Sequence, residues 1–144
     1  MAAMESNPGE VPKGFSIASL RGPFTRHNGP VYRADDDDDL RSGLFVLERH
    51  CNGMGFLHGG MIAAFSDSAL AWAVWWKTQR RSVTLKLTLT YLDTVKVGTW
   101  LEARPTVTAE KDDCVHLYAD LIGRYGAKVA RADAVFRLLR RNRV

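Results

Sequence analysis

The chain has 144 residues, of which 46% are hydrophobic and 25% are charged, and this composition is typical of a globular protein with one hydrophobic core. Its 20 basic and 16 acidic residues give a net charge of +4, which is too mixed for a nucleic-acid-binding face but suits a small polyanionic ligand. The two cysteines, Cys51 and Cys114, are too few for a disulfide framework and make no CxxC zinc motif.

The longest apolar stretch, residues 61–76, is interrupted by Ser66, Asp67 and Ser68. It falls short of the roughly 20 residues that a membrane span needs. Residues 1–19 mix Glu and Pro with small residues and contain no apolar core of a signal peptide. We therefore expect a cytoplasmic protein that makes no membrane contact.

In chain order, residues 1–14 carry Pro, Gly and Glu without periodicity and are expected to form a flexible tail ahead of a single domain at residues 15–144. Residues 15–24 predict a short helix and residues 29–34 a short strand. The five aspartates at residues 35–39 predict a solvated turn, because adjacent like charges repel and cannot all face one metal ion.

Residues 43–50 predict a strand, and residues 51–57 a loop. Residues 58–78 are rich in Ala, Leu, Met and Trp and predict a long helix that is apolar almost all round. A helix without a polar face is expected to be enclosed by protein. Trp72, Trp75 and Trp76 lie at helical spacing and are assigned to the core.

The C-terminal part predicts strands. Residues 82–95 alternate between apolar side chains on one face and Thr or Lys on the other, with the apolar face formed by Val83, Leu85, Leu87, Leu89 and Tyr91. Residues 99–109, 114–123 and 128–139 predict three more strands, with turns at residues 111–113 and 125–126. The fold class is α+β, in which an antiparallel sheet of five to six strands curls round the central helix to shield it from water.

The predicted helix starts at two glycines, Gly59 and Gly60, although glycine is a poor helix former. Without side chains, they let a ligand approach the N–H groups that a helix leaves unsatisfied at its start, where the helix dipole is positive. Such a site can polarise a thioester carbonyl and stabilise an oxyanion. Close packing of the helix against a strand explains one glycine, and two less well.

Asp67 lies inside the apolar helix, where its neighbours three and four positions away are small or apolar. Enclosing an unpaired carboxylate costs on the order of several kcal/mol, so we favour a functional carboxylate over a buried ion pair or a bond to a strand N–H. Along one helix, Asp67 is separated from Gly59 by roughly 12 Å, too far for both to act on one carbonyl. We therefore expect a site in which two antiparallel helices from two chains supply one group each.

Asn52, the sequence His58-Gly59-Gly60 and Asp67 resemble the signature of the phenylacetate-degradation (PaaI) type of hotdog acyl-CoA thioesterases, in the 4-hydroxybenzoyl-CoA thioesterase superfamily. The similarity extends from about residue 29 to residue 139. It implies a sheet wrapped round a central helix, a homodimer with a continuous sheet as the minimal unit, and dimers that pair into tetramers. No cofactor and no metal are implied.

The resemblance also implies residue roles. Asp67 would be the nucleophile or the general base that activates water, and the Gly59 N–H would polarise the thioester carbonyl, with Gly60 beside it in the substrate site. Asn52 and His58 would orient water or substrate. His58 is explained equally well as a helix N-terminal residue that hydrogen-bonds to the backbone.

Thr84 matches the position, on the strand after the helix, of a Ser or Thr near the lytic water in the family. The alternation of residues 82–95 explains it equally well as an ordinary residue of the polar face. Arg80 and Arg81 are candidates for binding the phosphates of CoA, with solvated surface as the alternative for each.

The predicted function is hydrolysis of an acyl-CoA thioester to a free acid and CoA, with the acyl group left open. A hotdog enoyl-CoA hydratase or dehydratase is one alternative, which the HGG entry and the early position of Asp67 disfavour. A non-catalytic acyl-CoA-binding hotdog domain is the other. Ser66 and Ser68 have no GxSxG setting, so a serine-hydrolase triad is not expected.

Overall fold

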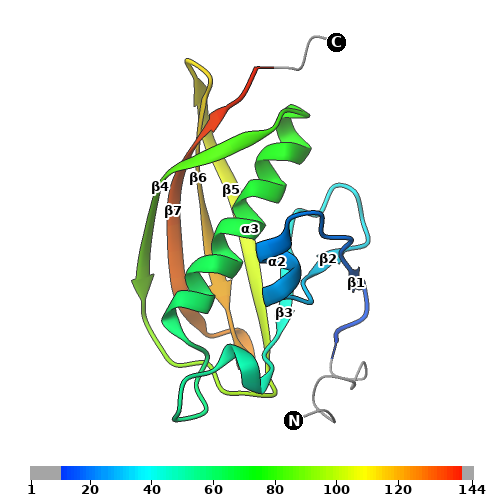
Figure 1. The fold of residues 1–144 in the computed structure, drawn as a ribbon, viewed down its shortest axis with the longest axis vertical. Coiled ribbons are helices and arrows are strands. Elements are labelled where there is room, and N and C mark those ends of the chain that lie inside the picture. Colours follow the sequence, from blue (N-terminus) through cyan, green and yellow to red (C-terminus); the bar gives the residue numbers. More distant parts are fainter. Residues whose placement is uncertain (1–10, 141–144) are drawn as a thin grey trace.

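The computed structural model describes residues 11–140, which form a curved seven-stranded antiparallel sheet with a long helix along its concave face (Figure 1). The elements in chain order are β1 (Phe15–Ile17), α2 (Pro23–Asn28), β2 (Tyr32–Ala34), β3 (Ser42–Phe45), η2 (Glu48–His50), α3 (Gly59–Thr78), β4 (Ser82–Tyr91), β5 (Trp100–Lys111), β6 (Cys114–Ile122), η3 (Arg124–Gly126) and β7 (Lys128–Leu138). Residues 1–10 of the predicted tail lie outside the described part.

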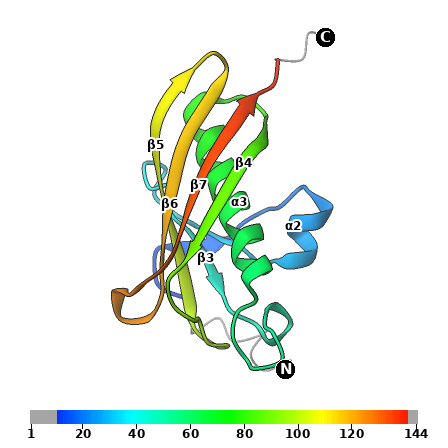
Figure 2. The same ribbon diagram turned by 90° about the vertical axis from the view of Figure 1, so that its left-hand side faces the viewer.

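The strands lie in the order β1-β2-β3-β5-β6-β7-β4, so β4 crosses over to the far edge of the sheet, where β7 is its one partner among the described strands. Strands β5, β6 and β7 form consecutive hairpins. The turn between β5 and β6 contains Asp112 and Asp113, both with positive φ (54° and 60°), the geometry of a two-residue hairpin loop that follows the sheet twist. Figure 2 shows α3 against the concave side of this sheet.

One face of α3 forms the core with the sheet. Its Phe65 and Leu70 pack with Leu101, Leu121 and Phe136 of the strands, and all five side chains are at most 1% exposed. Within residues 11–140, the sheet and α2 cover parts of α3 and leave the rest of its surface open, so the single chain does not by itself enclose the helix. No helix within residues 11–140 is long and apolar enough to cross a membrane.

The prediction that all three tryptophans at the end of α3 belong to the core is wrong. Trp75 and Trp76 are 39% and 36% exposed, because they follow the uncovered face of the helix. Trp72 is half-buried and stacks on Trp76 with ring centroids 5.7 Å apart. A single chain therefore leaves a strip of α3 open to a ligand or to a second chain.

The predicted helix at residues 15–24 is wrong. Phe15–Ile17 instead pairs with β2 as strand β1, and the helix begins only at Pro23, whose fixed φ and missing N–H suit a first helical turn. This extra strand raises the strand count to seven, above the predicted five to six. The predicted strand at residues 43–50 ends at Phe45, before η2.

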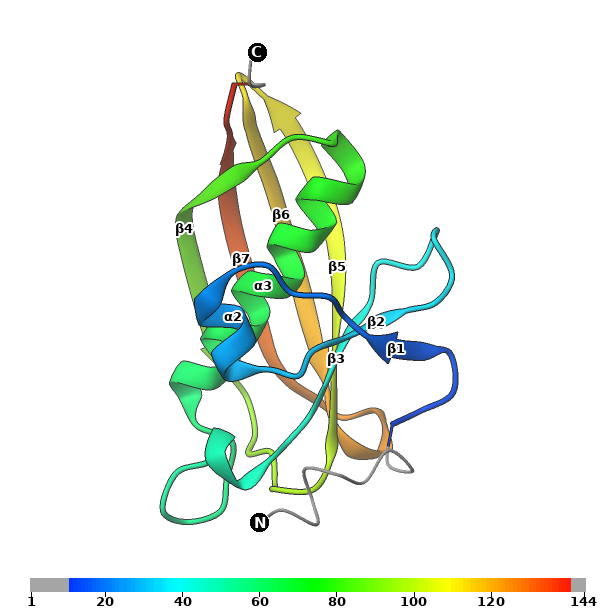
Figure 3. The same ribbon diagram turned by 45° about the vertical axis from the view of Figure 1, so that its right-hand side comes forward.

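The short helix α2 that follows β1 packs on α3, and Figure 3 shows it lying across that helix.

The aspartate run joins β2 to β3 as a turn, as predicted. The Asp36 carboxylate accepts a hydrogen bond from the Asp38 N–H at 3.0 Å. Asp39 pairs with Arg41 at 2.6 Å, and this hydrogen bond lowers the pKa of the Asp39 carboxyl. Within residues 11–140, no cluster of His, Cys, Asp and Glu side chains is arranged to hold a metal ion.

A β-bulge in β4 changes which side chains face the helix. Thr84 pairs with Phe136, but the next paired residue is Lys86, opposite Val135, so Leu85 is the extra residue. Paired residues share a face, and Phe136 is buried under α3. Thr84 therefore faces the helix, whereas Leu85 is 54% exposed. The predicted unbroken alternation of residues 82–95 is wrong at this point.

Candidate active site

Asp67 lies in the middle of α3 and is oriented by a residue of β4. The Thr84 hydroxyl donates a hydrogen bond of 2.6 Å to Asp67 Oδ1. Asp67 is half-buried rather than enclosed, because the alanines beside it on α3 leave its carboxylate open. No ion pair holds Asp67 within residues 11–140, and its second oxygen accepts no hydrogen bond there. One oxygen is thus fixed, while the other is free to act on a bound molecule.

His58 caps the start of α3, and most of the N–H groups there are used within the chain. The Gly60 N–H donates to His58 Nδ1 at 2.8 Å. The N–H groups of Met61 and Ile62 donate to the His58 carbonyl oxygen at 2.9 and 3.0 Å. The Gly59 N–H has no acceptor in the described part of the chain. It is the helix-start donor that remains for a ligand.

Packing within the chain explains Gly60 but not Gly59. A Cβ atom on Gly60 would lie 3.0 Å from His58 Nδ1, a close contact. A Cβ atom on Gly59 would meet only the ring of Tyr91 at 3.6 Å, which is an ordinary van der Waals distance. Close packing against a strand, the alternative reading of the glycine pair, therefore does not account for Gly59.

Tyr91 connects the end of β4 to the start of α3, and no sequence pattern singled it out as a site residue. Its hydroxyl donates a hydrogen bond of 2.8 Å to the Gly59 carbonyl oxygen. Tyr91 is 51% exposed, and its ring lies 3.6 Å from the position that a Cβ atom on Gly59 would take. The β4 strand thereby fixes both groups of the candidate site, with Thr84 at Asp67 and Tyr91 at Gly59.

Asn52 organises the loop before α3. Its Oδ1 accepts hydrogen bonds from the N–H groups of Met54 (2.9 Å) and Phe56 (3.2 Å), which close a turn at Gly55, where φ is +81°. The side-chain nitrogen of Asn52 has no partner within residues 11–140. The Asn52 side-chain oxygen is thus used in hydrogen bonds within the loop, and the side-chain nitrogen is the group that can donate a hydrogen bond to water or substrate.

Arg80 and Arg81 lie just beyond the opposite end of α3, roughly 30 Å along the helix axis from Gly59. The Arg80 guanidinium pairs with Asp113 at 3.0 Å and donates to the Leu139 carbonyl oxygen. It thereby ties the end of β7 to the β5–β6 turn. Arg81 is exposed. In a single chain, these arginines are not part of the site formed by α3 and β4.

Gly59 and Asp67 are eight positions apart in an unbroken helix, which separates them by roughly 12 Å. One carbonyl group cannot contact both within a single chain. The outer edge of β4 pairs with no strand in the described part of the chain, and the strip of α3 beside it is open. Both features leave this side of the molecule available to a second copy.

Two sequence comparisons decide the family. The family model described as "Thioesterase superfamily" matches residues 54–115. A protein of Pseudomonas aeruginosa named "Putative esterase PA0474" is 32% identical over 100 residues, which cover 67% of this chain and 75% of that protein. The chain belongs to the thioesterase superfamily. This confirms the predicted class of enzyme, a thioester hydrolase.

Solved structures confirm the hotdog fold of this thioesterase. The E. coli PaaI protein from the phenylacetic acid degradation operon aligns with a TM-score of 0.67 and 17% identity, over 96% of this chain and 89% of that chain. The BH2602 protein of Bacillus halodurans with CoA aligns with a TM-score of 0.66 and 22% identity, over 72% of this chain and 70% of that chain. The smu.793 protein of Streptococcus mutans bound to acetyl CoA aligns with a TM-score of 0.67 and 19% identity, over 92% of this chain and 94% of that chain.

The two serines next to Asp67, Ser66 and Ser68, are not placed to act as nucleophiles in this thioesterase. Ser66 is fully buried against the sheet, where no substrate can reach it. The Ser68 hydroxyl lies 3.5 Å from the Arg33 guanidinium. Neither serine contacts a histidine base in the described residues, as a serine nucleophile would require. Asp67 is the polar side chain of mid-α3 that is both accessible and oriented.

Proposed function

We propose that this thioesterase hydrolyses acyl-CoA thioesters to a free acid and CoA, with Asp67 as the catalytic carboxylate and the Gly59 N–H of a second copy as the oxyanion donor. The observation that carries the proposal is a carboxylate held by Thr84 through one oxygen, on the same helix as the Gly59 N–H. Neither the second Asp67 oxygen nor this N–H has a hydrogen-bond partner among residues 11–140. Two similar structures are named as containing CoA or acetyl CoA, which supports CoA as the thiol component.

In the proposed reaction, the Gly59 N–H donates a hydrogen bond to the thioester carbonyl oxygen and stabilises the negative charge that develops on it. Asp67 either takes a proton from an attacking water or attacks the carbonyl carbon itself, and water then hydrolyses the resulting anhydride. The tetrahedral intermediate collapses with loss of CoA as a thiolate. Thiols have pKa values of about 8.5, so this leaving group requires little protonation.

The proposed site contains Asp67 of one copy and Gly59 of another, because antiparallel α3 helices bring these positions together. The open strip of α3 and the free edge of β4 support a dimer with a continuous sheet. Tyr91 and Leu92, at the end of β4, are 51% and 54% exposed and would be covered there. We propose this homodimer as the minimal unit, with pairing of dimers into tetramers. We also propose that the protein works in the cytoplasm, where a reducing environment keeps the free thiols of Cys51 and Cys114 reduced.

The test is thiol release from a panel of acyl-CoAs, measured with a thiol-reactive dye. We expect free CoA to appear in proportion to acid formed, because hydrolysis separates the acyl group from the thiol. Crotonyl-CoA separates hydrolysis from hydration, since a hydratase would remove the enoyl absorbance without releasing thiol. Binding of acyl-CoA without thiol release, for every acyl chain length and ring type tried, would contradict the proposal.

Replacement of Thr84 by valine is expected to lower kcat about 10- to 100-fold, since a hydrogen bond to a charged group contributes about 1.5–3 kcal/mol and its loss frees the Asp67 carboxylate to rotate. Valine keeps the shape of threonine and its preference for strands. Thr84→Ser, which retains the hydroxyl, is the matched control and should stay within about 3-fold of the wild type. Equal kcat values for the two variants would show that Thr84 is only a surface residue.

A further inference from the structure

Arg33 of β2 is a half-buried cation that has no carboxylate partner within residues 11–140. Its guanidinium donates to Ser42 Oγ, lies 3.5 Å from Ser68 Oγ and stacks on the ring of Trp72 with its central carbon 5.1 Å from the ring centroid. Every one of these contacts is neutral. The positive charge of Arg33 is therefore not compensated within the described chain.

Other arginines of the chain differ from Arg33 in this respect. Four other arginines each form an ion pair with an acidic side chain at 2.6–3.2 Å: Arg41, Arg80, Arg104 and Arg131. Desolvation by burial lowers the pKa of Arg33 to about 10, which reflects the cost of holding a charge away from water without a counter-ion. A bound anion would remove this cost. The Arg33 guanidinium, with its planar fork of donors, is suited to a carboxylate.

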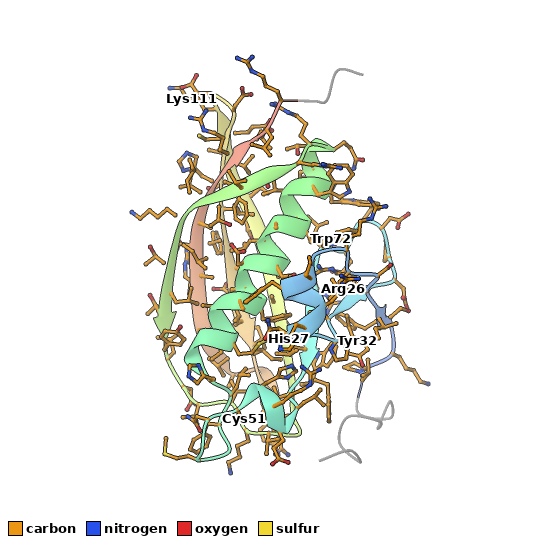
Figure 4. The ribbon with its side chains drawn as sticks, viewed as in Figure 1. Arg26, His27, Tyr32, Cys51, Trp72 and Lys111 are labelled. Atoms are coloured by element: carbon orange, nitrogen blue, oxygen red, sulfur yellow. The ribbon has the colours of Figure 1, made fainter. Side chains whose placement is uncertain are left out.

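Arg33 is close to the candidate active site, because Ser68 follows Asp67 directly on α3. On the helix surface, Ala64 and Ala71 lie between these two side chains, three or four positions from each. Both alanines are half-buried, so short methyl groups line the path from Asp67 to Ser68. Figure 4 shows Trp72, on which Arg33 stacks, projecting from α3 toward the β2 side.

The separation of the two groups limits the length of a molecule that spans them. Consecutive Cα atoms are about 3.8 Å apart, and the guanidinium lies 3.5 Å from Ser68 Oγ. Adding the reach of the Asp67 and Ser68 side chains, roughly 3 Å each, places the Asp67 carboxylate and the guanidinium at most roughly 13 Å apart. Reacting atoms approach to about 3–3.5 Å, and an arginine–carboxylate hydrogen bond takes about 2.8 Å. What remains accommodates an acyl chain of at most roughly six carbons.

We infer that Arg33 binds a carboxylate at the far end of the acyl group, so that the preferred substrates are short dicarboxylic acyl-CoAs with one thioester and one free carboxylate. The inference rests on the proposed function and names its substrate class. The methyl groups of Ala64 and Ala71, which lie between Asp67 and Ser68 on α3, form the surface against which the methylene groups would lie.

The test compares glutaryl-CoA with valeryl-CoA, which has the same chain length and no second carboxylate. We expect the wild type to have the higher kcat/KM for glutaryl-CoA. Arg33→Met should lower kcat/KM for glutaryl-CoA about 10- to 100-fold, the usual loss for a charge-assisted hydrogen bond. It should change kcat/KM for valeryl-CoA by less than about 3-fold. Succinyl-CoA with butyryl-CoA and adipyl-CoA with hexanoyl-CoA extend the comparison to four and six carbons.

Two further variants control for charge and folding. Arg137→Met removes an exposed arginine from β7 and should leave the preference for glutaryl-CoA unchanged. Arg33→Lys keeps the charge but not the planar fork, and is expected to keep part of the preference. If Arg33→Met does not fold, as judged by circular dichroism, the wild-type ratio and Arg33→Lys still decide the matter. A lysine variant with an unchanged ratio at full activity would contradict bidentate binding.

Three results would overturn the inference. The first is a wild type that hydrolyses valeryl-CoA as well as or better than glutaryl-CoA, which leaves the proposed function intact. The second is an equal loss for both substrates in Arg33→Met together with a higher inhibition constant for free CoA, which would assign Arg33 to the CoA phosphates. The third is no thiol release from any acyl-CoA, which would remove the proposed function and this inference with it.

Discussion

Asp67→Asn is expected to lower kcat for thiol release by about 10²- to 10⁴-fold, the range for loss of a general base. The amide has the shape of the carboxylate and can still accept the hydrogen bond that Thr84 donates at 2.6 Å. It cannot accept a proton from water or attack the carbonyl. Because Asp67 is half-buried and makes no ion pair in the described residues, the melting temperature and the oligomeric state should not change.

The control for removal of one negative charge is Glu110→Gln, at an exposed position of β5. This variant should have wild-type kcat and KM. If Asp67→Asn turned over acyl-CoA at a rate close to that of the wild type, Asp67 would have no part in the chemistry. A large drop in kcat with a lower melting temperature would instead point to a structural role.

Gly59→Pro is expected to lower kcat about 10²- to 10³-fold, the cost of losing one oxyanion donor. Proline removes the N–H that has no acceptor in the described chain and is favourable at the first position of a helix. The preceding residue, His58, already has φ −64° and ψ 136°, the extended conformation that precedes proline. Gly59→Ala keeps the N–H and adds a methyl group 3.6 Å from the Tyr91 ring, so it should retain far more activity.

Mixing the two inactive variants tests whether the site is shared. In a dimer of one Asp67→Asn chain and one Gly59→Pro chain, a shared site pairs the intact Asp67 with the intact Gly59 once. Random exchange gives half hybrid dimers with one working site of two, so about a quarter of wild-type activity is expected. If each site belonged to one chain, the mixture would stay inactive after exchange had been verified by native mass spectrometry.

The sequence was sufficient to predict the features that depend on local periodicity and composition. The helix from Gly59 to Thr78 and strands β5 to β7 are long enough for their patterns to dominate. It predicted the glycine entry and Asp67 as the candidate groups, since each conflicts with helix propensity or burial. It also predicted, from the length of the helix, that these two groups cannot meet within one chain.

Features that depend on tertiary packing could not be predicted. The short strand β1 forms only because β2 pairs with it, and Trp75 is exposed because the sheet does not reach around α3. The bulge at Leu85 changes the face of Thr84, which no alternation pattern shows. The hydrogen bond from Tyr91 to Gly59 joins residues 32 positions apart. Arg33 is notable because no carboxylate of residues 11–140 pairs with it.

The bulge in β4 divides this strand into two parts that can be changed independently. After it, the half-buried Leu87 and Leu89 anchor the strand against the helix. Before it, Thr84 orients the carboxylate and contributes little to the core. A protein engineer can therefore vary residues 82–84 to retune the reaction without repacking the interior, whereas inserting or deleting one residue after Leu85 would turn the anchoring leucines toward water.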